Sequence, residues 1–249
     1  MSNIFLIASG KGGVGKTTVT ANIAACLDKL NRKVLLFDAD LRLKNLDIVL
    51  GLSDKTVFDI EDLYLQRCSF EKVIINHPLH NNLFFIPGPL KLISESTLLY
   101  NFIINLAFSQ SKNFDYILID CPSGIGTALN EMAKKSVKMI VVATPDLPSV
   151  RDAEKTTELA YEKGIYDIKL IVNRIRPGLI KKGLAPDIDN IIDNTSVRLL
   201  GLVPEDVRVI INANTGVLLS DLKRSRAKTA FENISSRIDG NDVDLYKFW

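Results

Sequence analysis

The strongest constraint on the fold of this chain is a glycine-rich stretch near its beginning, GKGGVGKTT at residues 10–18. Four residues fill the fixed places of the phosphate-binding loop pattern G-x-x-x-x-G-K-[ST], namely Gly10, Gly15, Lys16 and Thr17. Residues 3–8 before the loop are an apolar run typical of a buried strand. Apolar residues recur at helical spacing after it, at Val19, Ile23, Leu27 and Leu30. The sequence therefore predicts a strand, a phosphate loop and a helix in succession.

The chemistry of this loop favours a nucleoside phosphate. Glycine has no Cβ, so successive backbone N–H groups can turn toward a phosphate oxygen. Lys16 adds a positive charge, and Thr17 offers a hydroxyl to Mg²⁺. The N-terminus of the following helix points its positive end at the same place. A glycine turn without a ligand is the alternative, and the strand and helix on either side argue against it.

Strand-like and helix-like segments alternate along the 249 residues, a length that suits one α/β domain. Apolar runs predict strands at 3–8, 33–37, 83–87, 115–119, 138–143, 169–172 and 199–203. Periodic segments predict helices at 58–65, 98–108, 152–163 and 228–237. This alternation predicts an α/β fold with a mostly parallel twisted sheet and helices on both faces. We expect one domain over residues 1–238 and a short C-terminal tail over 239–249.

Composition argues against several classes of protein. A net charge of +2 is too small to favour nucleic acid as a bulk electrostatic partner. The three cysteines are widely spaced without a C-x-x-C pair, which argues against disulfides and a structural metal and favours a reducing compartment; they are Cys26, Cys68 and Cys121. His77 and His80 lack partners at ligand spacing, so we expect them on a surface loop. The first apolar run is too short for a signal peptide or a membrane span, which predicts a cytoplasmic protein.

Acidic residues follow two of the predicted strands. Asp38 and Asp40 come after the strand at 33–37, and Asp120 comes after the strand at 115–119. Ligands of open parallel sheets bind beyond the carboxyl ends of the strands. Asp38 and Asp120 are therefore candidates to support Mg²⁺, and Asp40 is a candidate to orient an attacking water. A helix N-cap or turn for Asp120 and a turn for Asp40 are the alternatives.

Several motifs together resemble the ParA/MinD class of ATPases, whose deviant Walker A loop carries a second lysine. Lys11 occupies that place here. Residues 38–47 resemble switch I of the division-site regulators in this class, and residues 120–125 resemble their switch II. Three further segments also match, at 144–153, 172–176 and 200–206. The resemblance extends to about residue 237 and implies the P-loop NTPase fold of the deviant Walker A type.

The resemblance implies a role for each matching residue. The nucleotide would be bound by Lys11, Gly12, Gly13, Val14, Gly15, Lys16, Thr17, Thr18, Asn173, Arg174, Pro204 and Glu205. The catalytic residues would be Lys11, Lys16, Asp40 and Asp120, and the metal ligands Thr17, Asp38 and Asp120. Lys11 would reach across a dimer interface to the phosphates held by the other subunit. Asn173 would read the edge of adenine, because a carboxamide offers both a donor and an acceptor.

The implied activity is that of a Mg²⁺-dependent ATPase switch. Two subunits would form a homodimer when ATP binds, and the dimer would separate after ATP is hydrolysed. Such a protein would take part in placing the division septum, recruiting the division inhibitor MinC under a MinE-like or polar regulator. Two alternatives remain open: a ParA-type partitioning ATPase on DNA and a flagellar-placement ATPase with the same dimer. The near-neutral charge and the switch I sequence argue against DNA binding.

The chain departs from the family at a few positions. Arg42, Lys44 and Gly126 stand where the family commonly has glycine, arginine and glutamate. Members of the family end in a basic amphipathic helix that binds the membrane. Here residues 239–242 interrupt that pattern, and the last eight residues hold one lysine and two aspartates. The tail either packs on the body or stays disordered, or its aromatic residues make peripheral contact with an anionic membrane.

Overall fold

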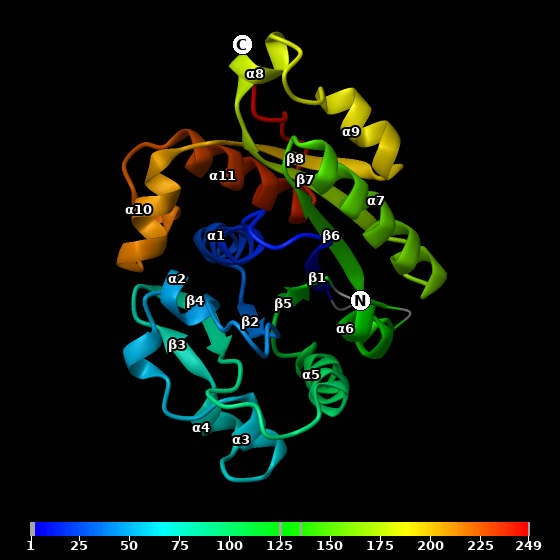
Figure 1. Cartoon of the computed structure of the whole chain (residues 1–249). Coiled ribbons are helices and arrows are strands. Elements are labelled where there is room, and N and C mark those ends of the chain that lie inside the picture. The colour runs from blue at the N-terminus through cyan, green and yellow to red at the C-terminus, as the bar shows by residue number, and fades with distance from the viewer. Residues whose placement is uncertain (1–2, 125, 135, 249) are drawn as a thin grey trace.

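A sheet of eight strands runs through the centre of the molecule (Figure 1). From one edge to the other the strands are β3 (Ile75–His77), β4 (His80–Ile86), β2 (Val34–Asp38), β5 (Tyr116–Ser123), β1 (Asn3–Ser9), β6 (Lys138–Ala143), β7 (Ile168–Ile175) and β8 (Arg198–Pro204). Neighbouring strands are parallel except β3, which pairs antiparallel with β4. The prediction of a mostly parallel sheet is confirmed.

The computed structural model describes residues 3–124, 126–134 and 136–248. The predictions that involve Ile125 in switch II and Trp249 in the tail lie outside the described residues. The helices are α1 (Lys16–Lys29), α2 (Leu46–Val49), α3 (Ile60–Tyr64), α4 (Phe70–Val73), α5 (Ser96–Gln110), α6 (Gly126–Met132), α7 (Leu147–Glu162), α8 (Pro177–Lys181), α9 (Ile188–Thr195), α10 (Val207–Thr215) and α11 (Arg226–Ile238). Two short 3₁₀ turns are η1 (Ser53–Lys55) and η2 (Leu219–Asp221).

Alternating side chains of the central strand β1 fill two separate cores, because successive residues of a strand point to opposite faces. Ile4 and Leu6 pack in the core beneath α5, α6 and α7. Phe5 and Ile7 pack in the core beneath α1 and α11. Figure 1 shows these two sets of helices on opposite sides of the sheet. The predicted covering of both faces is therefore confirmed, and it leaves the strand ends free to carry a site.

The two histidines are buried, so the prediction of a surface loop is wrong. His77 ends β3 and His80 begins β4, in a hairpin at the edge of the sheet. The ring nitrogens of His80 lie 2.8 Å from a carboxylate oxygen of Asp28 and 3.0 Å from one of Asp221. These partners come from α1 and η2, far away in the sequence. The burial is therefore compensated by hydrogen bonds that local spacing cannot reveal.

Some element boundaries also differ from the predictions. β5 continues to Ser123, so Asp120 lies within this strand rather than after it. α7 begins at Leu147 instead of 152, because Asp146 caps its N-terminus and proline is accepted in the first helical turn. The sequence patterns also missed the short or partly exposed helices α2, α4, α6, α8, α9 and α10. These are brief elements whose packing, not their periodicity, fixes them.

The three cysteines are free thiols, in agreement with the expected lack of disulfides. After α11 the chain continues without a regular helix or strand through residues 241–248. Asn233 and Arg237 of α11 donate to the backbone carbonyls of Asp244 and Val243 in this tail. Tyr246 packs against the core beneath α1, and Phe248 packs against the core beneath α7. No helix in the described ranges is long and apolar enough to cross a membrane.

Candidate functional site

The glycine loop joins β1 to α1 at the carboxyl edge of the sheet. Gly13 and Gly15 have φ of 81° and 91°, a left-handed conformation that favours glycine. A Cβ on Gly15 would collide with the amide of Asn173, and a Cβ on Gly10 would collide with the backbone of Asp152. At these two positions the loop lies against β7 and α7 without room for a side chain, so glycine is required there.

Asp120 gathers three donors from the first turns of α1. Its carboxylate accepts from Lys16 Nζ at 3.0 Å, from Thr17 Oγ1 at 2.7 Å and from Thr20 Oγ1 at 3.2 Å. Lys16 and Asp120 are both buried. Burial alone would lower the pKa of Lys16, but the charge of Asp120 outweighs it and holds this pKa above its usual value. The lysine of the loop is thus a buried, fully charged group.

Asp38 lies beside Asp120 on the neighbouring strand, with the two residues in register. Its carboxyl group accepts from the backbone N–H of Asp40 at 3.1 Å and from that of Leu46 at 3.2 Å. Burial, together with the nearby charge of Asp120, raises the pKa of Asp38 to about 8. Asp40 is half-buried, and its carboxylate accepts from the backbone N–H of Leu43 at 3.2 Å. Asp40 therefore stabilises a turn, which is the alternative role that the sequence left open for it, and it also lies beside Asp38.

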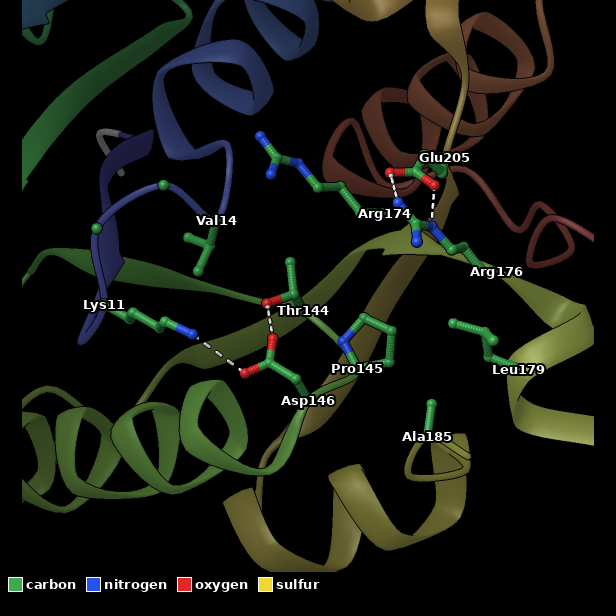
Figure 2. A pocket seen from close by; sticks show the side chains of 12 residues that line it. Lys11, Val14, Thr144, Pro145, Asp146, Arg174, Arg176, Leu179, Ala185 and Glu205 are labelled. Carbon is green, nitrogen blue, oxygen red and sulfur yellow. Dashed lines mark hydrogen bonds and ion pairs between the residues drawn. The ribbon is translucent and has the colours of Figure 1, made fainter. Parts of the chain in front are cut away.

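Lys11 projects to the opposite flank of the loop, toward the N-terminus of α7 (Figure 2). Its Nζ forms an ion pair with Asp146 at 3.2 Å, and both side chains are 44% exposed. The Asp146 carboxylate also accepts from Thr144 Oγ1 at 2.6 Å and caps α7 through the N–H of Ser149 at 3.0 Å. Burial alone would raise the pKa of Asp146, but these partners hold it below its usual value. Sequence reasoning missed Asp146, although an aspartate three residues before Ser149 and two before Pro148 is a helix-start signal.

The residues predicted to bind the base collect on this second flank. The buried amide of Asn173 donates to the carbonyl of Val14 in the loop at 2.8 Å. Arg174 follows it with φ of 57°, and Pro204 ends the adjacent strand β8. Glu205 accepts from Arg176 Nη2 at 2.7 Å. Figure 2 shows the pocket that this flank encloses, lined by Lys11, Gly12, Gly13, Val14, Thr144, Pro145, Asp146, Arg174, Arg176, Leu179, Ala185 and Glu205.

The predicted residues thus divide between two flanks of one loop. One flank, beside β2 and β5, carries the three aspartates Asp38, Asp40 and Asp120. The side chains of Lys16 and Thr17 contact Asp120 on this flank. Lys11 and the base-side residues stand on the side of β6, β7 and β8. Thr18 lies half-buried in the first turn of α1, and its carbonyl accepts from Asn22 at 2.9 Å. Strand order alone brings these distant segments together.

The chemistry of the Asp120 cluster fits Mg²⁺ bound with a nucleotide. Within the described ranges, no group of three His, Cys, Asp or Glu side chains is placed to hold a metal by itself. Thr17 and Asp120 nevertheless present oxygen ligands 2.7 Å apart beside the loop. Mg²⁺ is commonly held by one or two protein oxygens, with phosphates and water completing its shell. The donor set therefore suits a metal that arrives with phosphate.

Comparison with known proteins shows which family the chain resembles. A family model described as "ParA: NUBPL iron-transfer P-loop NTPase" matches residues 1–239. The septum site-determining protein MinD of Synechocystis is 36% identical over 249 residues, covering 100% of this chain and 93% of that protein. A chain of the MinC:MinD cell division protein complex of Aquifex aeolicus is 32% identical with a TM-score of 0.88 over 100% of both chains. MinD complexed with Mg-ADP from Pyrococcus horikoshii OT3 is 29% identical with a TM-score of 0.84 over 96% of each.

These findings decide between the interpretations that the sequence left open. The relatives at 36% identity are septum site-determining proteins rather than flagellar-placement or plasmid-partition proteins. The resemblance inferred from the loop and switch motifs is confirmed over the full length of the chain. The chain belongs to the MinD septum site-determining proteins, a branch of the ParA family of P-loop NTPases.

Proposed function

We propose that this chain hydrolyses ATP to ADP and phosphate, with Mg²⁺ as its cofactor. The observation that carries the proposal is the contact of Asp120 with Lys16 and Thr17 at the start of α1. The glycine loop supplies backbone N–H groups and Lys16 supplies a buried positive charge, the two features that a polyphosphate needs. The relative from Pyrococcus horikoshii, solved with Mg-ADP, supports a nucleotide in this place.

Three residues are proposed to hold the metal: Thr17, Asp120 and Asp38, which lies in register beside Asp120. A bound Mg²⁺ would neutralise charge on the phosphate oxygens. Asp40 is proposed to orient the attacking water and to accept a proton from it. It is half-buried and next to Asp38, and its charge acts on Lys16 of the loop.

Lys11 is proposed to complete the site of a second subunit in an ATP-dependent homodimer. There its charge would stabilise the negative charge that develops during phosphoryl transfer. In the single chain Lys11 is exposed and bound to Asp146 rather than buried in its own loop. This exposure supports a role between subunits, because a lysine committed to its own phosphates would face Asp120 as Lys16 does.

The dimer is proposed to recruit the division inhibitor MinC and to respond to a MinE-like or polar regulator. The Aquifex aeolicus relative belongs to a MinC:MinD complex, which supports the first partner. We place the protein in the cytoplasm, with ATP-dependent peripheral association with the cell membrane through the tail. Tyr246 and Phe248 would supply that contact, and both are partly buried against the body in the single chain.

Phosphate release from ATP tests the catalytic proposal. In Lys16→Ala the rate should fall at least about a hundredfold, because the phosphates lose a buried cation in a water-poor site. Lys72→Ala, an exposed lysine on α4, serves as the control and should keep the wild-type rate. Circular dichroism checks that Lys16→Ala is folded. A wild-type hydrolysis rate in folded Lys16→Ala would overturn the proposal.

A further inference from the structure

A separate cavity of about 320 Å³ lies at the amino ends of β7 and β8, the end of the sheet opposite to the phosphate loop. α11 packs along β8 on this side (Figure 1). Three basic side chains line the cavity, namely Lys169 near the start of β7, Arg198 at the start of β8 and Arg237 in the last turn of α11. Residues 240–242, which follow α11, complete the lining. None of these residues belongs to the nucleotide site, so their positive charge needs its own explanation.

Two of the basic side chains are neighbours in the sheet. Lys169 and Arg198 are in register in the parallel pairing of β7 with β8. The regular pairing ends soon afterwards, because β8 carries one extra residue after Leu199 and β7 bulges by one residue before Ile175. Residues in register lie on the same face of a sheet, on strands about 4.8 Å apart. Two like charges at this spacing repel each other, which costs stability unless an opposite charge lies close to both.

No acidic side chain compensates this pair. In the part of the chain that the structure describes, neither Lys169 nor Arg198 forms a side-chain hydrogen bond or an ion pair. Lys169 is half-buried, so its charge is also partly removed from water. On the neighbouring strand β6, at the same end of the sheet, Lys138 does have an acidic partner, since its Nζ lies 3.9 Å from a carboxylate oxygen of Asp167. The two cations of β7 and β8 therefore differ from their neighbour.

Arg237 adds a third positive charge and a free hydrogen-bond donor. Its Nη1 donates to the carbonyl of Val243 at 2.8 Å, whereas its Nε is buried without a partner in the described chain. Asp242 lines the cavity but is exposed and forms no ion pair with another described residue. Asp244 is paired with Lys247 at 2.9 Å, and Lys247, with a smaller contribution from Arg237, lowers the pKa of Asp244. The cavity thus keeps more positive than negative charge.

We propose that this cavity binds a phosphate group, either as the free ion or in the headgroup of an anionic lipid. The planar fork of a guanidinium matches two phosphate oxygens, and a lysine adds a point charge. A phosphate between Lys169 and Arg198 would offset their repulsion. It would also bring hydrogen-bond acceptors to Arg237, whose buried Nε lacks one. A lipid headgroup held here would lie beside the tail, the segment proposed above to contact the membrane.

Calorimetric titration with inorganic phosphate tests the site directly. The full chain is first saturated with Mg-ADP, so that the glycine loop is already occupied. In Lys169→Ala/Arg198→Ala the dissociation constant for phosphate should rise about tenfold or more, because two charged hydrogen bonds are lost. The matched control is Lys72→Ala/Lys91→Ala, which removes the same net charge from exposed positions and should bind phosphate like the wild type.

Co-sedimentation with vesicles, in the presence of Mg-ATP, distinguishes the two sources of phosphate. The vesicles contain phosphatidylcholine alone or an equal mixture with phosphatidylglycerol. If the ligand is a lipid headgroup, Lys169→Ala/Arg198→Ala should bind the mixed vesicles about tenfold more weakly than the wild type and the control variant. If the ligand is the free ion, the three proteins should bind these vesicles alike, and the loss should appear only in the calorimetric titration.

Thermal melting checks that the variants are folded. Lys169→Ala/Arg198→Ala should melt no lower than the wild type, because it removes a repulsive pair. The inference would be overturned if this variant bound both phosphate and mixed vesicles like the wild type, or if the control variant lost as much affinity. Absence of wild-type binding to both probes would also overturn it. The rate of ATP hydrolysis should be the same in all three proteins, so failure here leaves the proposed function untouched.

Discussion

Asp120 receives donors from Lys16, Thr17 and Thr20, while Asp38 stands in register beside it. A buried ion pair is stable only when its remaining hydrogen-bonding capacity is also used, and here the two threonine hydroxyls complete the shell. Removal of the Asp120 carboxylate would leave Lys16 buried without its charge partner, which typically costs about 3–5 kcal/mol. The residues proposed for catalysis therefore also hold the loop in place before any nucleotide binds.

His77 gives the stability of the fold a dependence on pH. Its Nδ1 accepts from the backbone N–H of Leu79 at 3.2 Å, and its Nε2 lies 3.0 Å from the carbonyl of Leu50, so the neutral ring is satisfied. Burial, with a smaller contribution from His80, lowers the pKa of His77 below its usual value. The unfolded chain therefore binds this proton more readily than the folded chain. The stabilisation is present above the usual histidine pKa and is lost as the pH falls through it toward the lowered value.

We expect the free energy of unfolding, measured by urea denaturation, to fall between pH 7 and pH 5 in the wild type. His77→Gln removes this titration while keeping a side chain that can hydrogen-bond. Its unfolding free energy should be lower at pH 7 and should change less over the same interval. Equal slopes for the two proteins would show that His77 does not carry the effect.

At the scale of elements, β8 and α11 meet where Gly201 leaves no room for a side chain. A Cβ at this position would collide with Cγ1 and Cδ1 of Ile234, which is fully buried in α11. Gly201→Ala should lower the free energy of unfolding by about 1–3 kcal/mol, because the core cannot expand without moving the helix. Urea denaturation measures this change.

The double variant Gly201→Ala/Ile234→Ala provides the control for that prediction. Ile234→Ala alone should cost about 2–5 kcal/mol by leaving a cavity. The new methyl group would partly fill this cavity, so the double variant should lose less stability than the sum of the two single variants. Strict additivity would mean that the two positions do not meet as described.

Elements were predictable where their pattern was long and local. The strands at 3–8, 115–119 and 138–143 and the helix at 228–237 were found within a few residues of their true bounds. The strand at 83–87 was found as the second part of β4. β3 and the start of β4 were missed, because the burial of His80 depends on Asp28 and Asp221, which reach it only in the folded chain. The bulge in β7 was missed for a similar reason, since its register break exists only against β8.

The site was predictable to the extent that it follows a continuous motif. The loop residues and Asp120 lie together as the strand order of such sheets requires. The ion pair of Lys11 with Asp146 could not be read from spacing, because 135 residues separate the two side chains. The hydrogen bond from the Asn173 amide to the carbonyl of Val14 was equally unpredictable from the sequence, because it depends on how the bulge orients that amide.

At the scale of the whole molecule, the contact between Lys11 and Asp146 opposes the proposed homodimer. Lys11 must leave Asp146 before it can reach the phosphates of another subunit. An exposed ion pair of this kind is worth roughly 0.2–1 kcal/mol. Two such pairs must break in a symmetric dimer, one in each subunit. Asp146→Asn removes the charge and keeps an N-cap for α7, so its ATP-dependent dimer should form at up to about thirtyfold lower protein concentration.

Light scattering after size exclusion, with ATP or ADP present, measures this equilibrium. Lys11→Ala serves as the opposite case and should stay monomeric with ATP. ADP should leave each variant monomeric, which shows that the change concerns the triphosphate state. A weaker dimer in Asp146→Asn would mean that the carboxylate supports assembly instead of restraining it.

The position of β1 in the middle of the sheet has a consequence for synthesis on the ribosome. Both neighbours of β1 are encoded far downstream, because β5 begins at Tyr116 and β6 at Lys138. At typical translation speeds the first strand emerges roughly 5–30 s before its second neighbour. For most of that interval neither edge of this apolar strand has a partner strand, although α1 follows directly and can cover one of its faces. A chaperone at the ribosomal exit tunnel would therefore shield β1, the strand that precedes the glycine loop.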